Sequence, residues 1–398
     1  MNDKKLTIGL FGFGCVGQGL YEVLNKTELL NASISKIVVK TKNKERSLPA
    51  SYFLYDKEEI LQDAKINTVV ELIDDATAAY EIVTRALKAG KNVVSANKKL
   101  IAENYQELID LAKANGVSFL YEASVCGSIP IIRNLEEYYN NDSLSAIAGI
   151  CNGTTNYILT QTNSGKTYDV ALSEAQDLGF AESDPTLDVD GFDSKFKLQI
   201  LIKHAFGLTT RPEDVFNYGV RHIKPEDVTF ALEKGYRIKL LSFAAKVDSK
   251  VVGFVAPHFV KNDHATFNVN NEFNAVTVQA LFSDEQLFVG KGAGSYPTAS
   301  AVLSDISALQ YDYQYEYHRA QQQITPVLSD DFLVKIYLAS SDKDRLDAFK
   351  FVEREEYLQS NTYNYVIGWV NFSTLRAIDF NKEPALFFGI LPEKIKVN

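Results

Sequence analysis

A glycine-rich turn close to the start of the chain constrains its fold more than any other feature. The motif Gly12-x-Gly14-x-x-Gly17 follows the apolar run Leu6–Phe11 and precedes a stretch with apolar residues at helical spacing. In such a strand–turn–helix unit the first glycine permits a tight turn, the second lets the backbone approach a pyrophosphate, and the third allows close packing. The helix N-terminus then directs its free N–H groups at the anion. We therefore predict a dinucleotide-binding turn; the alternative is a glycine-rich turn that binds nothing.

Strand-like and helix-like runs alternate over residues 1–130, which we predict to be a dinucleotide-binding domain. The predicted strands lie at 6–11, 35–39, 68–73, 92–95 and 117–121, and the predicted helices at 16–30, 77–89 and 105–115. Such alternation favours parallel strands joined by right-handed helical crossovers. The predicted fold class is therefore α/β, with a Rossmann-type, doubly wound parallel sheet.

The pattern changes after this domain. Residues 131–295 mix helices with antiparallel-looking strands and predict an α+β domain for substrate binding and dimerisation. Residues 296–325 contain one helix, at 298–309, that we expect to return to the dinucleotide domain. Residues 331–398 are predicted to run strand–helix–strand–strand–helix–strand and to form a small α+β module.

Charge and cysteine content limit the possible partners. Lys and Arg number 41 against 51 Asp and Glu, which gives a formal net charge of -10. An acidic chain without a basic stripe argues against nucleic acid or an anionic membrane as partner. Three cysteines, Cys15, Cys126 and Cys151, are typical of reduced thiols inside a cell. With no long apolar segment and no signal-peptide pattern, we expect a soluble, cytoplasmic protein.

The end of the predicted second strand bears on the choice of cofactor. A fold that prefers NAD usually has an acidic residue there, which holds the ribose 2′-hydroxyl group. This chain has Lys40, followed by Lys42, Lys44 and Arg46. Because cations suit a 2′-phosphate group, we predict a preference for NADP, with NAD possible, and Lys40 as the contact. The alternative is a charged loop exposed to solvent.

A second constellation lies at residues 175–197, which hold five aspartates, one glutamate and two lysines. Gly179, Pro185 and Gly191 punctuate the segment and indicate a defined path. Asp193 and Lys197 are four residues apart at the start of a predicted helix, so they share one face of it. A partly buried lysine with a carboxylate partner is a candidate for proton transfer. The alternative is a polar surface loop; burial lowers and Asp193 raises the pKa of the lysine, so the pattern leaves its direction open.

Several motifs together resemble the homoserine dehydrogenase family. They are GFGCVG, SANKK at 95–99, YEASVCGSIP at 121–130, GTTNYIL at 153–159, the acidic segment at 175–197, and GKGAGSYPTASAV at 290–302. Their order and spacing match over roughly residues 5–310. The resemblance implies an oxidoreductase that reversibly reduces L-aspartate 4-semialdehyde to L-homoserine with NAD(P)H, in threonine, methionine and isoleucine biosynthesis.

The resemblance also assigns residues to roles by position. The implied catalytic residues are Lys197, Lys98 and Asp193, and the implied substrate-binding residues are Glu182, Asp188 and Thr154. The cofactor-binding residues are Gly12, Phe13, Gly14, Cys15, Val16, Gly17, Lys40, Lys98 and Gly294. A monovalent cation, usually sodium in this family, is expected at Glu122, Val125, Gly127 and Ile129, largely on main-chain oxygens.

Two positions depart from what the family leads us to expect. Asp74-Asp75 stands where a Gly-Gly pair is frequent, which is unfavourable for a dinucleotide unless the carboxylates point away or pair with Lys91 or another cation. Lys98 is followed by Lys99, so the second catalytic lysine could be either one, and we choose Lys98.

The resemblance leaves the last module and the assembly less defined. Residues 331–398 resemble an ACT regulatory domain, which in some family members binds an amino acid such as threonine; the alternative is a degenerate module that only supports dimerisation. We expect a homodimer through the second domain, with higher assembly through this module possible. Two other functions remain open: a dehydrogenase of another amino-alcohol, and a dinucleotide-sensing regulatory protein without turnover.

Overall fold

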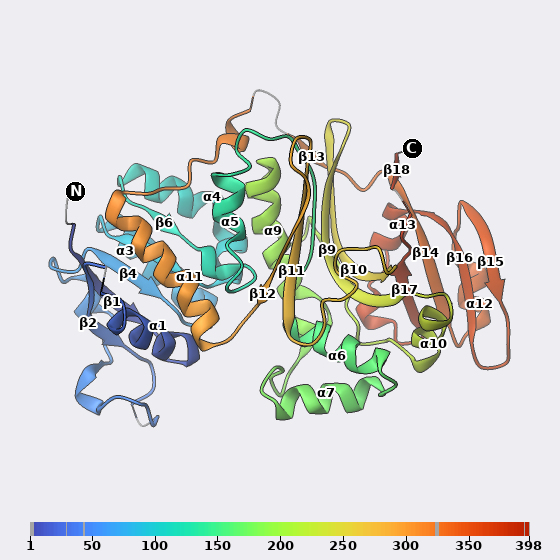
Figure 1. The fold of residues 1–398 in the computed structure, drawn as a ribbon, viewed down its shortest axis with the longest axis horizontal. Helices are drawn as coiled ribbons and strands as arrows, with labels where there is room; N and C mark the ends of the chain where they lie inside the picture. Colours follow the sequence, from blue (N-terminus) through green and yellow to red (C-terminus); the bar gives the residue numbers. More distant parts are fainter. Residues whose placement is uncertain (1–3, 29, 43, 323–325, 394, 398) are drawn as a thin grey trace. The chain divides into compact units, whose positions relative to one another are not determined.

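The computed structural model describes residues 4–28, 30–42, 44–322, 326–393 and 395–397. The chain forms two compact units, and each contains segments that are distant in sequence. The first comprises Met1–Asn140 and Gly290–Arg319, and the second comprises Asn141–Val289 and Ala320–Asn398 (Figure 1). Parts of the predicted segments 296–325 and 331–398, namely residues 323–325, 394 and 398, lie outside the described residues. The predicted domain boundaries remain predictions.

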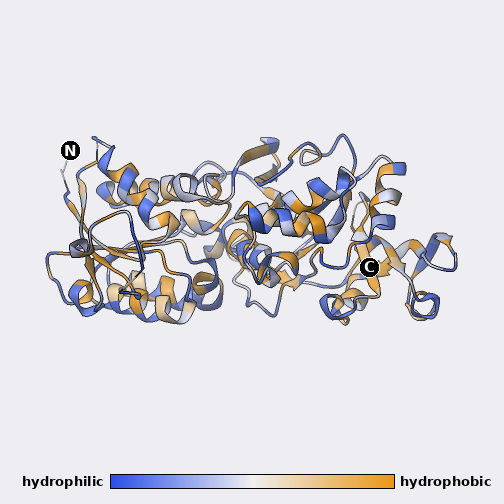
Figure 2. Cartoon of the chain, turned by 90° about the horizontal axis from the view of Figure 1, so that it is seen from below, coloured by the Kyte–Doolittle hydropathy of each residue, from blue (hydrophilic) through white to orange (hydrophobic). Residues whose placement is uncertain are grey.

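The first unit is built on a six-stranded sheet in the order β3-β2-β1-β4-β5-β6. Its strands are β1 (Leu6–Phe11), β2 (Ala32–Val38), β3 (Phe53–Leu54), β4 (Thr68–Glu71), β5 (Asn92–Ser95) and β6 (Phe119–Leu120). All neighbouring strands pair in parallel. Figure 2 colours the chain by hydropathy and shows helices that carry hydrophobic residues on one side and hydrophilic residues on the other. The strand order is that of a Rossmann-type sheet, which confirms the predicted fold class.

Six α-helices belong to the described part of this unit. They are α1 (Cys15–Asn25), α2 (Glu58–Leu61), α3 (Ala76–Lys88), α4 (Lys98–Ala114), α5 (Ile131–Glu136) and α11 (Ser295–Ala308). The predicted helix at 16–30 is wrong at its end, because the hydroxyl group of Thr27 donates to the Val23 carbonyl oxygen at 2.8 Å as the last turn closes. The predicted helix at 105–115 is wrong at its start, because the Asn97 side chain caps α4 by accepting from Leu100 N.

The helix α11, although distant in sequence, lies beside α1 (Figure 1). The hydroxyl group of Ser295 donates to the carbonyl oxygen of Cys15 at 2.8 Å. A Cβ atom on Gly19 would meet the Ser295 carbonyl oxygen at 2.8 Å, so only glycine allows this approach. The start of α11 is thereby fixed against the first turns of α1.

The second unit contains a mixed sheet in the order β12-β11-β7-β9-β10-β17-β14-β16-β15, with β8, β13 and β18 paired off this path. Its strands are β7 (Leu144–Ile150), β8 (Phe216–Asn217), β9 (Arg237–Val247), β10 (Lys250–Val260), β11 (Phe273–Ala280), β12 (Asp284–Lys291), β13 (Val327–Leu328), β14 (Phe332–Ser340), β15 (Glu353–Leu358), β16 (Asn364–Asn371), β17 (Leu386–Ile390) and β18 (Lys396–Val397). Its helices are α6 (Gly153–Asn163), α7 (Tyr168–Asp177), α8 (Thr186–Val189), α9 (Phe192–Phe206), α10 (Pro225–Glu233), α12 (Lys343–Ala348) and α13 (Phe372–Arg376).

The C-terminal elements run β14-α12-β15-β16-α13-β17, which is the predicted order of strands and helices. Their strands pair antiparallel in the order β17-β14-β16-β15, the arrangement of a split β-α-β fold. This module continues the larger sheet, because His258 in β10 pairs with Ile390 in β17. The Tyr337 hydroxyl group also donates to Asp227 Oδ1 of α10 at 2.7 Å. Among the described residues, no helix is both long enough and apolar enough to cross a membrane.

Candidate active site

The glycine-rich turn has the geometry that a bound pyrophosphate needs. Gly12 has a φ of +93°, and a Cβ atom there would lie 2.4 Å from the Leu72 carbonyl oxygen. A Cβ atom on Gly17 would lie 2.5 Å from the Gly12 carbonyl oxygen. At Gly14, which precedes the first turn of α1, a Cβ atom would meet nothing within 4 Å. Packing therefore explains the first and third glycines, whereas the open space at Gly14 fits a ligand that approaches the backbone.

Three other predicted cofactor residues have defined places in the same unit. Phe13 is buried and packs edge-on against Phe53, with ring centroids 5.0 Å apart. Gly294 has a φ of +117° and precedes α11. Cys15 is exposed at the start of α1. The aromatic pair therefore anchors the turn in the core, whereas Cys15, at the start of α1, stays exposed to solvent.

Lys98 is the first residue of α4 and follows β5 at its carboxyl end. The Asn97 side chain caps the helix through Leu100 N at 2.9 Å and also donates to the Ile73 carbonyl oxygen at 3.0 Å. Lys98 is half-buried, whereas Lys99 is exposed and lies 3.8 Å from Glu103 on its own helix. The geometry favours Lys98 over Lys99 as the lysine that faces a ligand at the strand ends.

The buried carboxyl group of Glu71 supports the start of α4 through a chain of hydrogen bonds. The Ser95 hydroxyl group donates to Glu71 Oε2 at 2.6 Å, and Ile73 N donates to Glu71 Oε1 at 2.7 Å. Ser95 Oγ in turn accepts from Asn97 N at 3.1 Å. Burial raises the pKa of Glu71 from 4.5 to about 7. Glu71 lies in an apolar run that predicts a strand, and no pattern in the sequence marks it as a support for α4.

The basic segment after β2 contains one firmly held cation. Lys40 is exposed. Arg46 donates to the carbonyl oxygens of Thr41 at 2.8 Å and Lys44 at 2.9 Å, and its guanidinium group lies 5.0 Å from the centre of the Phe53 ring. Backbone hydrogen bonds and an aromatic face therefore orient Arg46.

Asp74 and Asp75 do not pair with Lys91. Asp75 is the N-cap of α3 and accepts hydrogen bonds from Thr77 N and Ala78 N, both at 3.1 Å. Lys91 instead donates to the carbonyl oxygens of Asp63 and Ile66, both at 2.7 Å. Of the alternatives left open for the two carboxylates, pairing with Lys91 is not the one that the described residues form, because that ammonium group donates to main-chain oxygens. The Asp75 carboxylate is used by its own helix.

In the second unit, Lys197 is the centre of a buried polar network. Its ammonium group donates to Asp193 Oδ2 at 2.6 Å and to the Cys151 carbonyl oxygen at 2.7 Å. The Asn152 amide group donates to Asp193 Oδ2 at 2.9 Å and to Asp188 Oδ1 at 2.7 Å. The Lys197 side chain is only 10% exposed. The four-residue spacing in α9 therefore makes the expected ion pair, and Asn152 extends it to a third predicted site residue.

The remaining predicted substrate residues, Thr154 and Glu182, form hydrogen bonds with residues outside this network. Thr154 donates from its hydroxyl group to the Phe180 carbonyl oxygen at 2.5 Å. Glu182 is exposed, and its backbone oxygen accepts from the Gln176 side chain at 3.0 Å. Asp190 is buried and holds Arg221 through two hydrogen bonds, of 2.7 and 3.0 Å. The acidic segment thus contains carboxylates in different roles: one paired with lysine, one with arginine, and one open to solvent.

The loop predicted to bind a cation offers main-chain oxygens rather than its carboxylate. Glu122 Oε1 and Oε2 accept from Ile132 N at 2.9 Å and Arg133 N at 2.8 Å, so this side chain serves the start of α5. Burial, together with the nearby Asp305, raises the pKa of Glu122 to about 8. Val125 and Gly127 are buried, and their carbonyl oxygens accept no hydrogen bond within the described ranges. Among the described residues these two oxygens therefore remain available as acceptors, whereas the Glu122 carboxylate is used by the start of α5.

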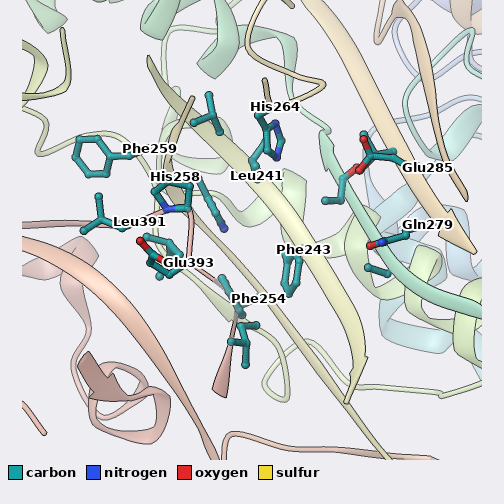
Figure 3. Close-up of a pocket in the computed structure, with 17 residues that line it drawn as sticks. Leu241, Phe243, Phe254, His258, Phe259, His264, Gln279, Glu285, Leu391 and Glu393 are labelled. Atoms are coloured by element: carbon teal, nitrogen blue, oxygen red, sulfur yellow. The ribbon is translucent and has the colours of Figure 1, made fainter. Parts of the chain in front are cut away.

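An apolar cavity of about 180 Å³ lies elsewhere in the second unit (Figure 3). It is lined by residues that include Phe243, Phe254, His258, His264 and Glu393. Burial lowers the pKa of His258 to about 4. None of the predicted site residues lines this cavity, so it is separate from the Lys197 network. Across the described chain, no group of three or more His, Cys, Asp or Glu residues could hold a metal ion.

Comparison with known proteins decides the family. A family model described as homoserine dehydrogenase matches residues 130–307, and the NAD binding domain model of the same family matches residues 12–122. The homoserine dehydrogenase of Lactococcus lactis is 39% identical over 313 residues, which cover 76% of this chain and 73% of that protein. The chain belongs to the homoserine dehydrogenase family.

Other homoserine dehydrogenases extend the likeness. The Bacillus subtilis protein is 39% identical over 316 residues, which cover 77% of this chain and 73% of that protein. The crystal structure of the enzyme from Thiobacillus denitrificans has a TM-score of 0.86 at 30% identity and covers 98% of this chain and 99% of that chain. A hyperthermophilic archaeal homoserine dehydrogenase in complex with NADPH has a TM-score of 0.67 at 26% identity and covers 78% of this chain and 99% of that chain. The structural likeness to the Thiobacillus enzyme includes the C-terminal module.

Proposed function

We propose that this protein catalyses the reversible NAD(P)H-dependent reduction of L-aspartate 4-semialdehyde to L-homoserine. The observation that carries the proposal is the buried network of Lys197, Asp193, Asn152 and Asp188, in a chain of the homoserine dehydrogenase family. Reduction adds a hydride to the aldehyde carbon, and the carbonyl oxygen takes up a proton. The bound nicotinamide cofactor supplies the hydride.

Lys197 is the group we assign to the proton. An ammonium group can polarise a carbonyl oxygen and then protonate it as negative charge develops. Asp193 holds this ammonium group at 2.6 Å and favours its charged form, while the Cys151 carbonyl oxygen fixes its direction. Lys98, at the start of α4, is assigned as a second cation for the same reaction. Asp193 is the carboxylate that orders the proton transfer.

Substrate recognition falls to the acidic residues around the network. The substrate carries an ammonium group, and Glu182 and Asp188 are assigned to hold it, with Thr154 beside them. Asp188 is already oriented by the Asn152 amide group at 2.7 Å. A dehydrogenase of another amino-alcohol would also need carboxylates for the substrate ammonium group, so the choice of substrate in the activity assay separates it. A sensor without turnover would not need Lys197.

The cofactor is assigned as NADP in preference to NAD. The support is chemical: Lys40 and the oriented Arg46 follow β2, where a 2′-phosphate group would require cations. Lys40→Asp should raise the KM for NADPH by about tenfold and leave that for NADH little changed, because a charged hydrogen bond is lost. Lys44→Asp, which makes the same charge change at another exposed position, is the matched control. An unchanged NADPH-to-NADH ratio in Lys40→Asp would remove the contact.

A sodium ion, a homodimer and a regulatory module complete the proposal. The carbonyl oxygens of Val125 and Gly127 are the donors that suit a monovalent cation, with Ile129 adjacent; activity in potassium, sodium and lithium salts of equal strength tests this. The second domain is assigned to dimerisation, and the module at residues 331–398 to an ACT-like role. Light scattering of the full chain tests the dimer, and calorimetric titration of the full chain with threonine tests the module.

The activity itself is tested by following NADPH absorbance with aspartate 4-semialdehyde. We expect turnover that depends on both reactants, and the reverse reaction with L-homoserine and NADP⁺. Cofactor binding without turnover would instead support the sensing protein. Turnover with other amino-aldehydes but not with the semialdehyde would support a different dehydrogenase.

A further inference from the structure

A second cavity in the C-terminal half of the chain is distinct from the Lys197 network and from the cavity of Figure 3. It measures about 380 Å³ and is bounded by three segments: the start of α9, residues 212–217, and residues 376–381. Phe192 and Lys195 line it from α9, and Arg376 and Asn381 line it from the C-terminal module. The cavity therefore lies where this module meets the helix that carries Lys197.

Hydrogen bonds hold its walls together. Arg376 donates to the carbonyl oxygens of Glu213 and Asp214, both at 2.6 Å, and pairs with Asp330 at 3.1 Å. The Asn381 side chain accepts from Gly219 N at 3.2 Å and donates to the Asp190 carbonyl oxygen at 3.2 Å. The Arg376 contacts join residues 376–381 to residues 212–217, and the Asn381 contacts join them to Gly219 and to Asp190, which lies two residues before α9.

Lys195 is a cation in this cavity without a counter-ion. The residue is 8% exposed, and its ammonium group lies 4.8 Å from the centre of the Phe192 ring. Within the described part of the chain, no carboxylate lies within ion-pair distance of the Lys195 ammonium group, and that group makes no hydrogen bond. Arg376, the other lining cation, is already paired with Asp330. A buried charge without a partner is costly, and one aromatic face does not replace its hydration.

The charges around Lys195 define which kind of ligand the cavity would bind. Burial lowers the pKa of Lys195, and the neighbouring positive charge of Arg376 lowers it further, against a smaller opposing effect of Glu213. Glu213 lies 3.3 Å from Arg211, so its charge is compensated elsewhere. Lys195 and Lys197 are two residues apart on α9 and point to different faces of it. Glu213 and Asp379 both line the cavity, and Asp379 pairs with Lys382 at 2.7 Å. Lys195 is therefore the lining charge for which the described residues supply no partner, and an anionic ligand would supply one.

We propose that this cavity binds a small metabolite through a carboxylate or phosphate group that pairs with Lys195. The ligand would touch both α9 and the C-terminal module, so it would connect the module to the helix of the proton-transfer network. The site takes an anion of modest size and is separate from the dinucleotide and substrate positions. Binding to it does not depend on the proposed reaction.

The test is calorimetric titration of the full chain with inorganic phosphate and with succinate, in sodium chloride of matched ionic strength. NADP⁺ is kept saturating, so that the glycine-rich turn is occupied. We expect saturable binding of one of the two anions, and which one binds identifies the group. Lys195→Gln should weaken it by at least about tenfold, because a charge-assisted hydrogen bond is lost. Lys246→Gln, at an exposed lysine of β9, should leave it unchanged.

A second measurement uses the unaltered protein, in case Lys195→Gln does not fold. Acetylation by acetic anhydride, read out by peptide mass spectrometry, should label Lys195, and the binding anion should reduce that labelling while Lys246 labelling stays constant. Absence of saturable binding by either anion would overturn the proposal, as would equal weakening in both variants. Failure to label Lys195 would do the same, since the ammonium group would then not open into the cavity.

Discussion

The two lysines assigned to the reaction are held in opposite ways. At the start of α4, the hydrogen bonds of Asn97, Ser95 and Glu71 fix the backbone from which Lys98 projects. In α9, hydrogen bonds of 2.6 and 2.7 Å fix the Lys197 ammonium group itself. The difference teaches that a lysine that only binds a ligand can be positioned through its backbone. A lysine that donates a proton needs hydrogen bonds to its ammonium group itself. Each prediction below tests one side of this contrast.

The largest effect is expected where the nitrogen atom is held directly. Lys197→Met should reduce kcat by about a thousandfold, because general acid catalysis contributes about 10²–10⁴-fold. It also leaves Asp193 buried without its partner, which should cost about 3–5 kcal/mol of the free energy of unfolding. The measurements are NADPH absorbance and urea unfolding. A folded variant with kcat close to that of the wild type would exclude Lys197 as the proton donor.

A double variant separates these two losses. Lys197→Met/Asp193→Asn removes both charges, so we expect it to recover most of the lost stability without recovering turnover. Recovery of turnover together with stability would mean that the single variant is inactive only because it is unfolded.

At the start of α4, we expect a smaller loss of activity, and only when Lys98 rather than Lys99 is replaced. Lys98→Met should lower kcat/KM by about a hundredfold if its charge acts on the bound reactants. Lys99→Met is the matched control, since Lys99 is exposed and pairs with Glu103 on its own helix. Steady-state kinetics of the two variants decide between the lysines. The reverse outcome, with Lys99→Met impaired and Lys98→Met active, would move the assignment by one residue.

Asn152 tests whether the network beyond Lys197 matters. Its amide group bridges Asp193 and Asp188, and its side-chain oxygen caps α6 through Thr155 N at 2.9 Å. Asn152→Asp keeps the cap and loses both donated bonds, so kcat/KM should fall by about tenfold or more. Asn152→Ala loses the cap as well and should unfold about 1 kcal/mol more easily. Full activity in Asn152→Asp would show that the bridge does not position the carboxylates.

Sequence patterns predicted the local features of the candidate site better than the contacts between distant residues. The Asp193–Lys197 pair follows from helical spacing alone, and the glycine motif between a strand and a helix predicts the Rossmann sheet. Asn152 and Glu71 were missed, because their partners come from elsewhere in the chain: Asp193 is 41 residues from Asn152, and Ser95 is 24 residues from Glu71. No local pattern encodes such a contact. The late start predicted for α4 has a different origin, because the Asn97 cap is a local contact with Leu100 N and the apolar spacing alone does not show it.

The two supporting networks should also differ in their response to pH. Asp193 is paired with Lys197, whereas within the described residues Glu71 has no cation against it. Burial raises the pKa of Glu71 from 4.5 to about 7. Between these values the folded protein keeps a proton that the unfolded chain releases, so the contribution of Glu71 to stability is full below pH 4.5 and is lost as the pH rises to about 7.

Glu71→Gln removes this titration and keeps a neutral polar side chain in its place. The difference in unfolding free energy between wild type and Glu71→Gln should therefore change by about 3 kcal/mol across that range, with the wild type relatively weaker at higher pH. Glu122, Asp305 and Asp227 also have raised pKa values, but both proteins contain them, so their effects cancel in the difference. Urea unfolding at a series of pH values measures it. A difference that stays constant would show that Glu71 remains ionised, and that the start of α4 is held by a charge after all.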